Sequence, residues 1–174
     1  MKGTIICCLR DLVVEKFGKE NWAAALTGAG FPPHQMFMPM QDVDDTQVQK
    51  LIESVCKTLG VTLVQAADAF GDYWVSVYSQ KLYSHYYAGH KDAKSLIQAM
   101  DAVHVQITKS MPNARPPRFT YEWKNDKTLV MHYRSHRGLI DILAGLARGV
   151  GKFYGEKLEV SKRGTDAIEI VFPK

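Results

Sequence analysis

The sequence predicts an α+β fold in which a helical N-terminal lobe packs on a four-stranded antiparallel sheet. Apolar residues recur every three or four positions up to about residue 111, which is typical of amphipathic helices. From residue 118 onwards, two pairs of segments alternate apolar and polar residues as strands do, and a helical segment separates the pairs. The C-terminal part is therefore expected to follow the order strand, strand, helix, strand, strand.

Length and composition bound the class of protein. A chain of 174 residues, 46% hydrophobic and 23% charged, is expected to form one soluble globular domain. The net charge of +4 is spread without a long basic run, which argues against nucleic acid as the main partner. No apolar stretch approaches the roughly 18 residues of a membrane span, and the run from Ile5 to Leu9 is too short for a secretory signal. We therefore expect a cytoplasmic protein.

Three helices are expected in the first sixty residues. The first two cover residues 2–17 and 20–27. After a proline-rich loop, Asp44 or Asp45 caps a third helix that ends at Gly60. The apolar positions of the first helix are Ile5, Leu9, Leu12, Val13 and Phe17. Cys7, Cys8 and Cys56 have no disulfide or metal spacing and are expected to be buried free thiols.

A fourth helix, capped by Thr62, is expected from Leu63 to about Tyr87 with Gly71 interrupting it. This segment is rich in aromatic side chains. Aromatic rings at such spacing form either a plain hydrophobic core or the wall of a cofactor site, and the spacing leaves both open. The rings are those of Phe70, Tyr73, Trp74, Tyr78, Tyr83, Tyr86 and Tyr87.

A single histidine marks the next helix. His104 lies beside an apolar stripe with helical spacing, so its imidazole is expected at the edge of the core. It could be a ligand, or simply a histidine that borders packed residues. The stripe consists of Leu96, Met100, Val103, Ile107 and Met111.

The predicted sheet begins with a hairpin. Arg118–Trp123 and 128–134 are strand-like and are joined by turn residues. A helix over 138–154 follows, and two further strands are expected at 156–162 and 165–172.

Three polar residues follow one another at every second position near the end of the second strand. In an extended chain Tyr133, Ser135 and Arg137 would point to the same side. A phenol, a hydroxyl and a guanidinium suit a pair of carboxylates. The alternative is the polar outer face of a half-buried strand.

These motifs together resemble the heme nitric-oxide/oxygen-binding (H-NOX, HNOB) family of the bacterial stand-alone type, which is related to the heme domain of the soluble guanylate cyclase beta subunit. The resemblance rests on M-D-x-V-H, R-P-P-R-F and H-Y-x-S-x-R, with MKGTI, AFGDYW and LAGLARGVGKF in support. It implies a helical subdomain at about 1–60 and a heme-enclosing α/β part at about 61–174. It also implies that His104 is the axial iron ligand and that Tyr133, Ser135 and Arg137 hold the heme propionates.

The resemblance extends to the residues that would pack against the porphyrin. Because there is no C-x-x-C-H motif, the cofactor is expected to be heme b (iron protoporphyrin IX). Pro117 and Ile5 match positions that press on the ring from its two faces, and Met100 would lie near the proximal face. A strand boundary at the proline pair and a plain core methionine are the alternatives.

The distal pocket is expected to select the gas. Members that hold dioxygen carry a distal tyrosine five residues past the arginine, where this chain has Ile142. The resemblance therefore implies an apolar pocket for nitric oxide and carbon monoxide, lined by Leu9, Trp74, Ile142 and Leu146. Tyr78 lies one helical turn after Trp74 and could instead donate to bound dioxygen, or bond to a backbone carbonyl.

The resemblance implies a sensor rather than an enzyme. Nitric oxide would weaken the His104–iron link and relax the heme distortion, and the signal would pass in trans to a histidine kinase or a diguanylate cyclase. The alternative from another class is a heme-free module whose basic loop, Arg115 to Arg118, contacts a protein or RNA.

Overall fold

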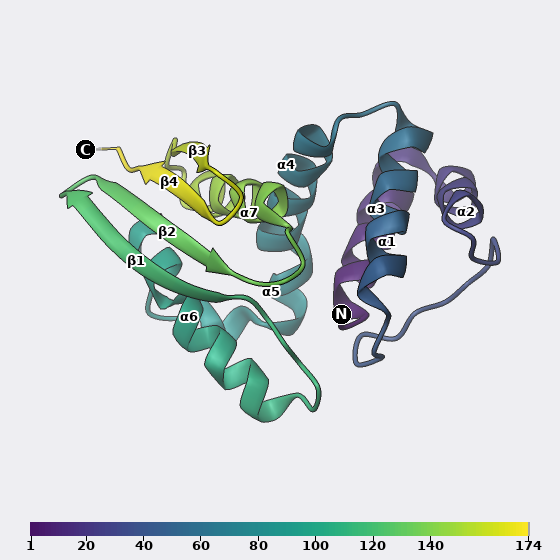
Figure 1. Ribbon diagram of the computed structural model, residues 1–174, viewed down its shortest axis with the longest axis horizontal. Coiled ribbons are helices and arrows are strands. Elements are labelled where there is room, and N and C mark those ends of the chain that lie inside the picture. The colour runs from purple at the N-terminus through teal and green to yellow at the C-terminus, as the bar shows by residue number, and fades with distance from the viewer. Residues whose placement is uncertain (174) are drawn as a thin grey trace. The chain divides into compact units, whose positions relative to one another are not determined.

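The computed structural model describes residues 1–173 (Figure 1). It contains two compact units, Met1–Ala66 and Ala67–Lys174. Within the described residues, none of the helices combines the length and the apolar character that crossing a membrane requires.

The first unit is helical. It contains α1 (Thr4–Phe17), α2 (Lys19–Gly28) and α3 (Asp45–Leu59), close to the predicted ranges. The loop before α3 is fastened to the start of α1, because the backbone N–H of Thr4 donates to the carbonyl of Pro39 at 2.9 Å. The core of this unit comes mainly from Ile6, Leu12, Val13, Trp22, Leu26, Val48, Leu51 and Val55.

Two predicted helix caps are confirmed. Asp44 accepts hydrogen bonds from the backbone N–H groups of Thr46 and Gln47 at 2.9 and 3.1 Å, so it is the cap of α3. The Thr62 hydroxyl accepts from the N–H of Gln65 at 3.2 Å, and the Gln65 side chain accepts from the N–H of Thr62 at 2.9 Å. Such a reciprocal capping box fixes the start of the next helix.

Two expectations about burial are wrong. Phe17 is the last residue of α1 and is 46% exposed, because the chain turns away at Gly18 with a φ of 91°. Cys7 and Cys8 are buried free thiols as expected, but Cys56 is only half-buried.

The second unit contains the predicted sheet. Its strands are β1 (Arg118–Asn125), β2 (Thr128–Arg134), β3 (Glu159–Arg163) and β4 (Ala167–Val171), all antiparallel in the order β1-β2-β4-β3. Two helices, α6 (Ala93–Ser110) and α7 (Ile140–Phe153), pack on it and on each other. The predicted α+β class and the predicted succession of strand, strand, helix, strand, strand along the chain are confirmed.

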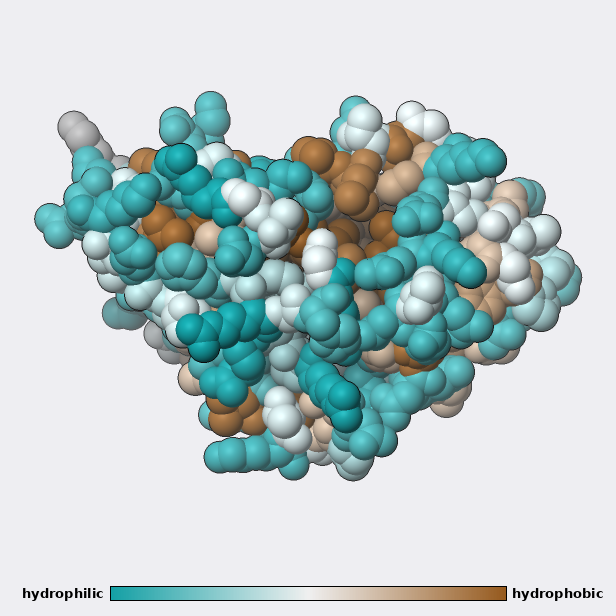
Figure 2. Space-filling view, viewed as in Figure 1, coloured by the Kyte–Doolittle hydropathy of each residue, from teal (hydrophilic) through white to brown (hydrophobic). Residues whose placement is uncertain are grey.

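The core of this unit lies between the sheet and the two helices. Leu129 and Met131 of β2 stand opposite Ile170 and Ile168 of β4, and all four side chains are at most 2% exposed. In Figure 2, hydrophilic side chains surround smaller groups of hydrophobic ones on the visible face of the sheet.

The aromatic segment is not the single helix that the sequence predicts. It starts as α4 (Leu63–Tyr73), widens into a π-helical turn, η1 (Trp74–Tyr78), and continues as α5 (Ser79–Leu82) and a 3₁₀ turn, η2 (Ser84–Tyr86). The side chain of Gln80 donates to the carbonyl of Val75 at 2.9 Å, which satisfies one acceptor at the wide turn. The interruption therefore falls at Trp74–Tyr78 and not at Gly71.

Gly71 has a packing role instead. It lies against Gly145 of α7, and a Cβ atom on Gly71 would come within 2.1 Å of the Gly145 carbonyl oxygen. A Cβ on Gly145 would come equally close to the carbonyl oxygen of Ala67, and one on Gly149 would lie 2.5 Å from that of Gly71. The backbones of α4 and α7 are therefore in direct contact along this glycine seam.

Candidate functional site

Helix α6 places His104 at the edge of the core of the second unit. The helix begins at Asp92, whose carboxylate accepts from the N–H of Ser95 at 2.7 Å. Leu96 and Ile97 are buried in the first turns. The imidazole of His104 is half-buried, with its ring centre 5.1 Å from that of Phe119.

The His104 imidazole has the protonation that a metal ligand requires. Its Nδ1 lies 2.7 Å from the carbonyl oxygen of Pro117, so Nδ1–H donates and Nε2 keeps a lone pair. Burial lowers the pKa of the imidazole below its ordinary value, which favours the neutral ring. These features fit a histidine that binds a heme iron through Nε2 and is oriented by a backbone carbonyl.

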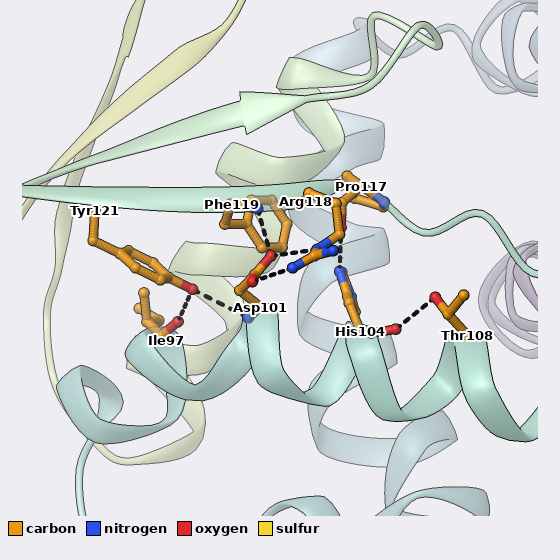
Figure 3. A network of polar contacts seen from close by, with 8 residues as sticks. All are labelled: Ile97, Asp101, His104, Thr108, Pro117, Arg118, Phe119 and Tyr121. Carbon is orange, nitrogen blue, oxygen red and sulfur yellow. Dashed lines mark hydrogen bonds and ion pairs between the residues drawn. The ribbon is translucent and has the colours of Figure 1, made fainter.

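Helix α6 is joined to the start of β1 by a group of polar contacts, called the clasp, between Asp101 and Ile97 of the helix and Arg118, Phe119 and Tyr121 of the strand (Figure 3). The Asp101 carboxylate accepts two hydrogen bonds from the Arg118 guanidinium, both at 2.7 Å, and a third from the N–H of Phe119 at 2.8 Å. The hydroxyl of Tyr121 donates to the carbonyl of Ile97 at 2.9 Å. The clasp fixes Pro117, the residue before Arg118, relative to the helix turn that carries His104.

Two side chains of the clasp, Asp101 and Tyr121, have shifted pKa values. Hydrogen bonds from Arg118 lower the pKa of Asp101 to about 2. Burial raises the pKa of Tyr121 to about 12. The sequence motifs contain both Asp101 and Arg118, but nothing in them indicates that residues 17 positions apart form a bidentate pair.

We expect Asp101→Ala to lower the free energy of unfolding by about 1–3 kcal/mol, because the N–H of Phe119 loses its acceptor. Arg118→Ala should cost less, because its side chain is 54% exposed and the ion pair is screened by solvent. The contribution of Asp101 is complete above its unfolded pKa of 3.8 and is lost as the pH falls towards 2. Urea denaturation at pH 7 measures the loss of unfolding free energy in the variants, and the same measurement at low pH measures the loss of the Asp101 contribution. If the stability of an Asp101→Asn variant falls at low pH as much as that of the natural protein, the predicted pH effect is contradicted.

The structure corrects the geometry expected for Tyr133, Ser135 and Arg137. Strand β2 ends at Arg134, so only Tyr133 lies in the strand, while Ser135 follows it and Arg137 lies in a turn. The alternation argument therefore fails for the last two. The turn still brings them together, because the backbone N–H of Arg137 donates to the Ser135 hydroxyl at 3.3 Å.

The donors at this end of β2 can serve carboxylates. Tyr133 is 6% exposed, and its hydroxyl accepts from the N–H of Leu139 at 3.4 Å, which leaves its own proton to donate. The guanidinium of Arg137 donates to the carbonyl of Arg115. A phenol, a hydroxyl and a guanidinium beside the segment that contacts His104 fit the two acidic tails of a heme.

Other predicted site residues belong to several elements. Trp74 and Tyr78 lie in the π-helical turn, with ring centres 5.4 Å apart, and Tyr78 is buried. Ile142 and Leu146 lie one turn apart on α7 and are both half-buried, and Met100 packs half-buried against the core of the second unit. Ile5 and Leu9 belong to α1 of the first unit.

Comparisons with known proteins identify the family. The haem-NO-binding (HNOB) family model matches residues 2–162. The chain is 27% identical over 156 residues to the soluble guanylate cyclase gcy-32 of Caenorhabditis elegans and 28% identical over 156 residues to gcy-34 of the same organism. These matches cover 87% of this chain but only 23% of each relative.

Solved structures agree over the whole chain. A crystal structure of an oxygen-binding H-NOX domain related to soluble guanylate cyclases matches 100% of this chain and 96% of its own, with 25% identity and a TM-score of 0.80. A mutant H-NOX from T. tengcongensis matches 100% of this chain and 98% of its own, with 25% identity and a TM-score of 0.82. This chain therefore belongs to the haem-NO-binding (H-NOX) family, a family of heme-containing, gas-binding sensor domains and not of enzymes.

Proposed function

We propose that this domain binds nitric oxide, with carbon monoxide as a further ligand, at a ferrous heme b whose iron is held by His104. The observation that carries the assignment of His104 is its neutral imidazole, which donates from Nδ1 to the carbonyl of Pro117 at 2.7 Å and leaves Nε2 for the metal. When bound, the heme supplies the iron that takes up the gas.

In this proposal, Tyr133, Ser135 and Arg137 bind the propionates. A carboxylate that reached Arg137 would replace the neutral carbonyl of Arg115 with a charged acceptor, and such charge-assisted hydrogen bonds contribute about 1.5–3 kcal/mol each. Pro117 would hold His104 through its carbonyl and press its ring on the porphyrin, with Met100 nearby on α6. The packing role of Ile5 and the place of Leu9 in the distal wall stay predictions.

The choice of nitric oxide rests on the side chains of α7. Ile142 and Leu146 are apolar and cannot donate a hydrogen bond. Bound dioxygen carries negative charge on its outer oxygen and gains from a donor, whereas nitric oxide on ferrous iron needs little such help.

The second candidate is a dioxygen-binding domain that uses Tyr78 as the donor. One observation favours it: Tyr78 is 5% exposed and stacks on Trp74, so its phenol lies inside the protein and next to a predicted wall of the gas pocket. One of the similar structures is an oxygen complex of an H-NOX domain, and this similarity supports dioxygen binding as the second candidate.

Exposure of the reduced, heme-loaded protein to air separates the two candidates. We expect no stable oxy spectrum in the natural protein and a new one in Ile142→Tyr, because the added phenol supplies the missing donor. Tyr78→Phe is the matched control and should leave both results unchanged. An oxy spectrum in the natural protein that Tyr78→Phe abolishes would instead establish the second candidate.

The proposed signal leaves through α6. If nitric oxide weakens the iron bond of His104, the imidazole keeps its hydrogen bond to Pro117, and the motion of α6 reaches β1 through the Asp101–Arg118 clasp. A histidine kinase or a diguanylate cyclase acting in trans is the proposed receiver, and the protein is proposed to work in the cytoplasm.

A further inference from the structure

A chain of aromatic rings starts at Trp74, which the proposed function places at the gas pocket, and continues through rings that gas sensing does not use. The ring of Trp74 stacks on that of Tyr83 with centres 6.2 Å apart, and Tyr83 contacts Tyr86 at 6.5 Å. At the inner end of the chain of rings, the ring centres of Trp74 and Tyr78 lie 5.4 Å apart. At the outer end, the ring centres of Tyr86 and His85 lie 4.0 Å apart. All five rings come from one short segment of the second unit.

The chain of rings leads from the interior to the surface. Tyr78 is 5% exposed, Trp74, Tyr83 and Tyr86 are half-buried, and His85 is exposed. The irregular backbone produces this arrangement, because the π-helical turn at Trp74–Tyr78 is followed within a few residues by the 3₁₀ turn at Ser84–Tyr86. A continuous α-helix would place residues 74 and 83 on different faces.

Indole and phenol rings are, with thiols, the protein side chains most easily oxidised by one electron. Rings that lie next to one another, with centres within about 7 Å, exchange an electron much faster than rings separated by aliphatic side chains. We propose that Trp74, Tyr83 and Tyr86 form a redox relay that carries oxidising equivalents from the heme to the surface. The relay rests on the proposed function, since that function places Trp74 at the gas pocket.

The oxidising equivalents that the relay carries would come from a hydroperoxide. The simplest such oxidant is hydrogen peroxide, which would react at the ferric heme. Each peroxide accepts two electrons and two protons and leaves as two water molecules. The first electron passes from Tyr86 through Tyr83 and Trp74, and the Tyr86 phenol gives its proton to water. The Tyr86 phenoxyl radical then takes a hydrogen atom from Tyr86 of a second protein copy, and the restored Tyr86 supplies the second electron and proton by the same route. The two phenoxyl radicals, one on each copy, form a carbon–carbon bond, and the two ring hydrogens move to the oxygens. The sum is one peroxide and two phenols giving one dityrosine and two waters.

The experiment treats the heme-loaded full chain with hydrogen peroxide and measures dityrosine fluorescence, the cross-linked peptide by mass spectrometry, and bleaching of the Soret band. We expect a cross-link through Tyr86 in the natural protein. Tyr83→Phe should lose this cross-link although Tyr86 is intact, and its heme should bleach faster because the oxidising equivalents stay inside. Phenylalanine keeps the ring and its packing, so the fold is retained.

Tyr154→Phe is the matched control, since Tyr154 is also half-buried but lies at the end of α7 outside the relay. It should leave the cross-link and the bleaching rate unchanged, and heme-free protein should give no cross-link. If Tyr83→Phe cross-links through Tyr86 as the natural protein does, the relay is overturned while the proposed function stands. A protein that takes up no heme would overturn both.

Discussion

Replacement of His104 with alanine is expected to give a folded protein that is purified without a Soret band. The imidazole is the proposed iron ligand, and its Nδ1–H···O contact with Pro117 already fixes the tautomer that iron needs. Loss of a group that merely orients a metal ligand costs about 10–100-fold in affinity, so loss of the ligand itself should exceed about 100-fold. Heme titration followed at the Soret band measures the change, and added imidazole should restore part of the spectrum.

His132→Ala provides the matched control. His132 lies on β2 next to Tyr133 but on the opposite side of the strand, where its Nε2 is 3.5 Å from the Glu122 carboxylate. Its replacement should leave heme binding unchanged. A normal Soret band in His104→Ala without imidazole would refute the ligand assignment and, with it, the proposed route of the signal through α6.

The second large effect is expected at the glycine seam. Gly145→Ala places a Cβ atom 2.1 Å from the carbonyl oxygen of Ala67, and a backbone group cannot turn aside as a flexible side chain can. The two helices must separate, which opens packing around them, so we expect a loss of about 3 kcal/mol or more in the free energy of unfolding. Since small domains are stable by only about 5–15 kcal/mol, the variant should express poorly.

Chemical denaturation with and without heme measures this loss. Gly164→Ala is the comparison: its added Cβ would lie no closer than 3.6 Å to a neighbouring atom, but its φ is 69°, so backbone strain alone should cost about 1–2 kcal/mol. A loss in Gly145→Ala no greater than that in Gly164→Ala would mean that α4 and α7 can separate freely.

Features set by neighbouring residues could be predicted from the sequence. The Asp44 cap and the Thr62–Gln65 capping box depend on side chains within three residues of the helix start, and both were predictable from residue type. The hairpin between β1 and β2 and the period change after the histidine helix are also local. These elements, placed in order, suffice to predict an antiparallel sheet covered by helices.

Features that depend on distant residues could not be predicted in the same way. Gly71 looks like a helix breaker until Gly145 is known to lie against it. The pair of Asp101 and Arg118 forms only when α6 and β1 are side by side. The predicted bounds of β2, 128–134, agree with the structure, but Ser135 and Arg137 continue the alternating pattern although the backbone has already turned.

The wide turn at Trp74–Tyr78 has a consequence for how this segment could change over time. A π-helical turn holds one more residue than an α-helical turn, so it acts as a single-residue insertion whose cost is absorbed locally. Deleting one residue there would remove the wide turn and leave an ordinary α-helix, while the side chains on either side keep their directions. The segment could therefore gain or lose its wide turn by a single-residue change, without any substitution in the elements that flank it.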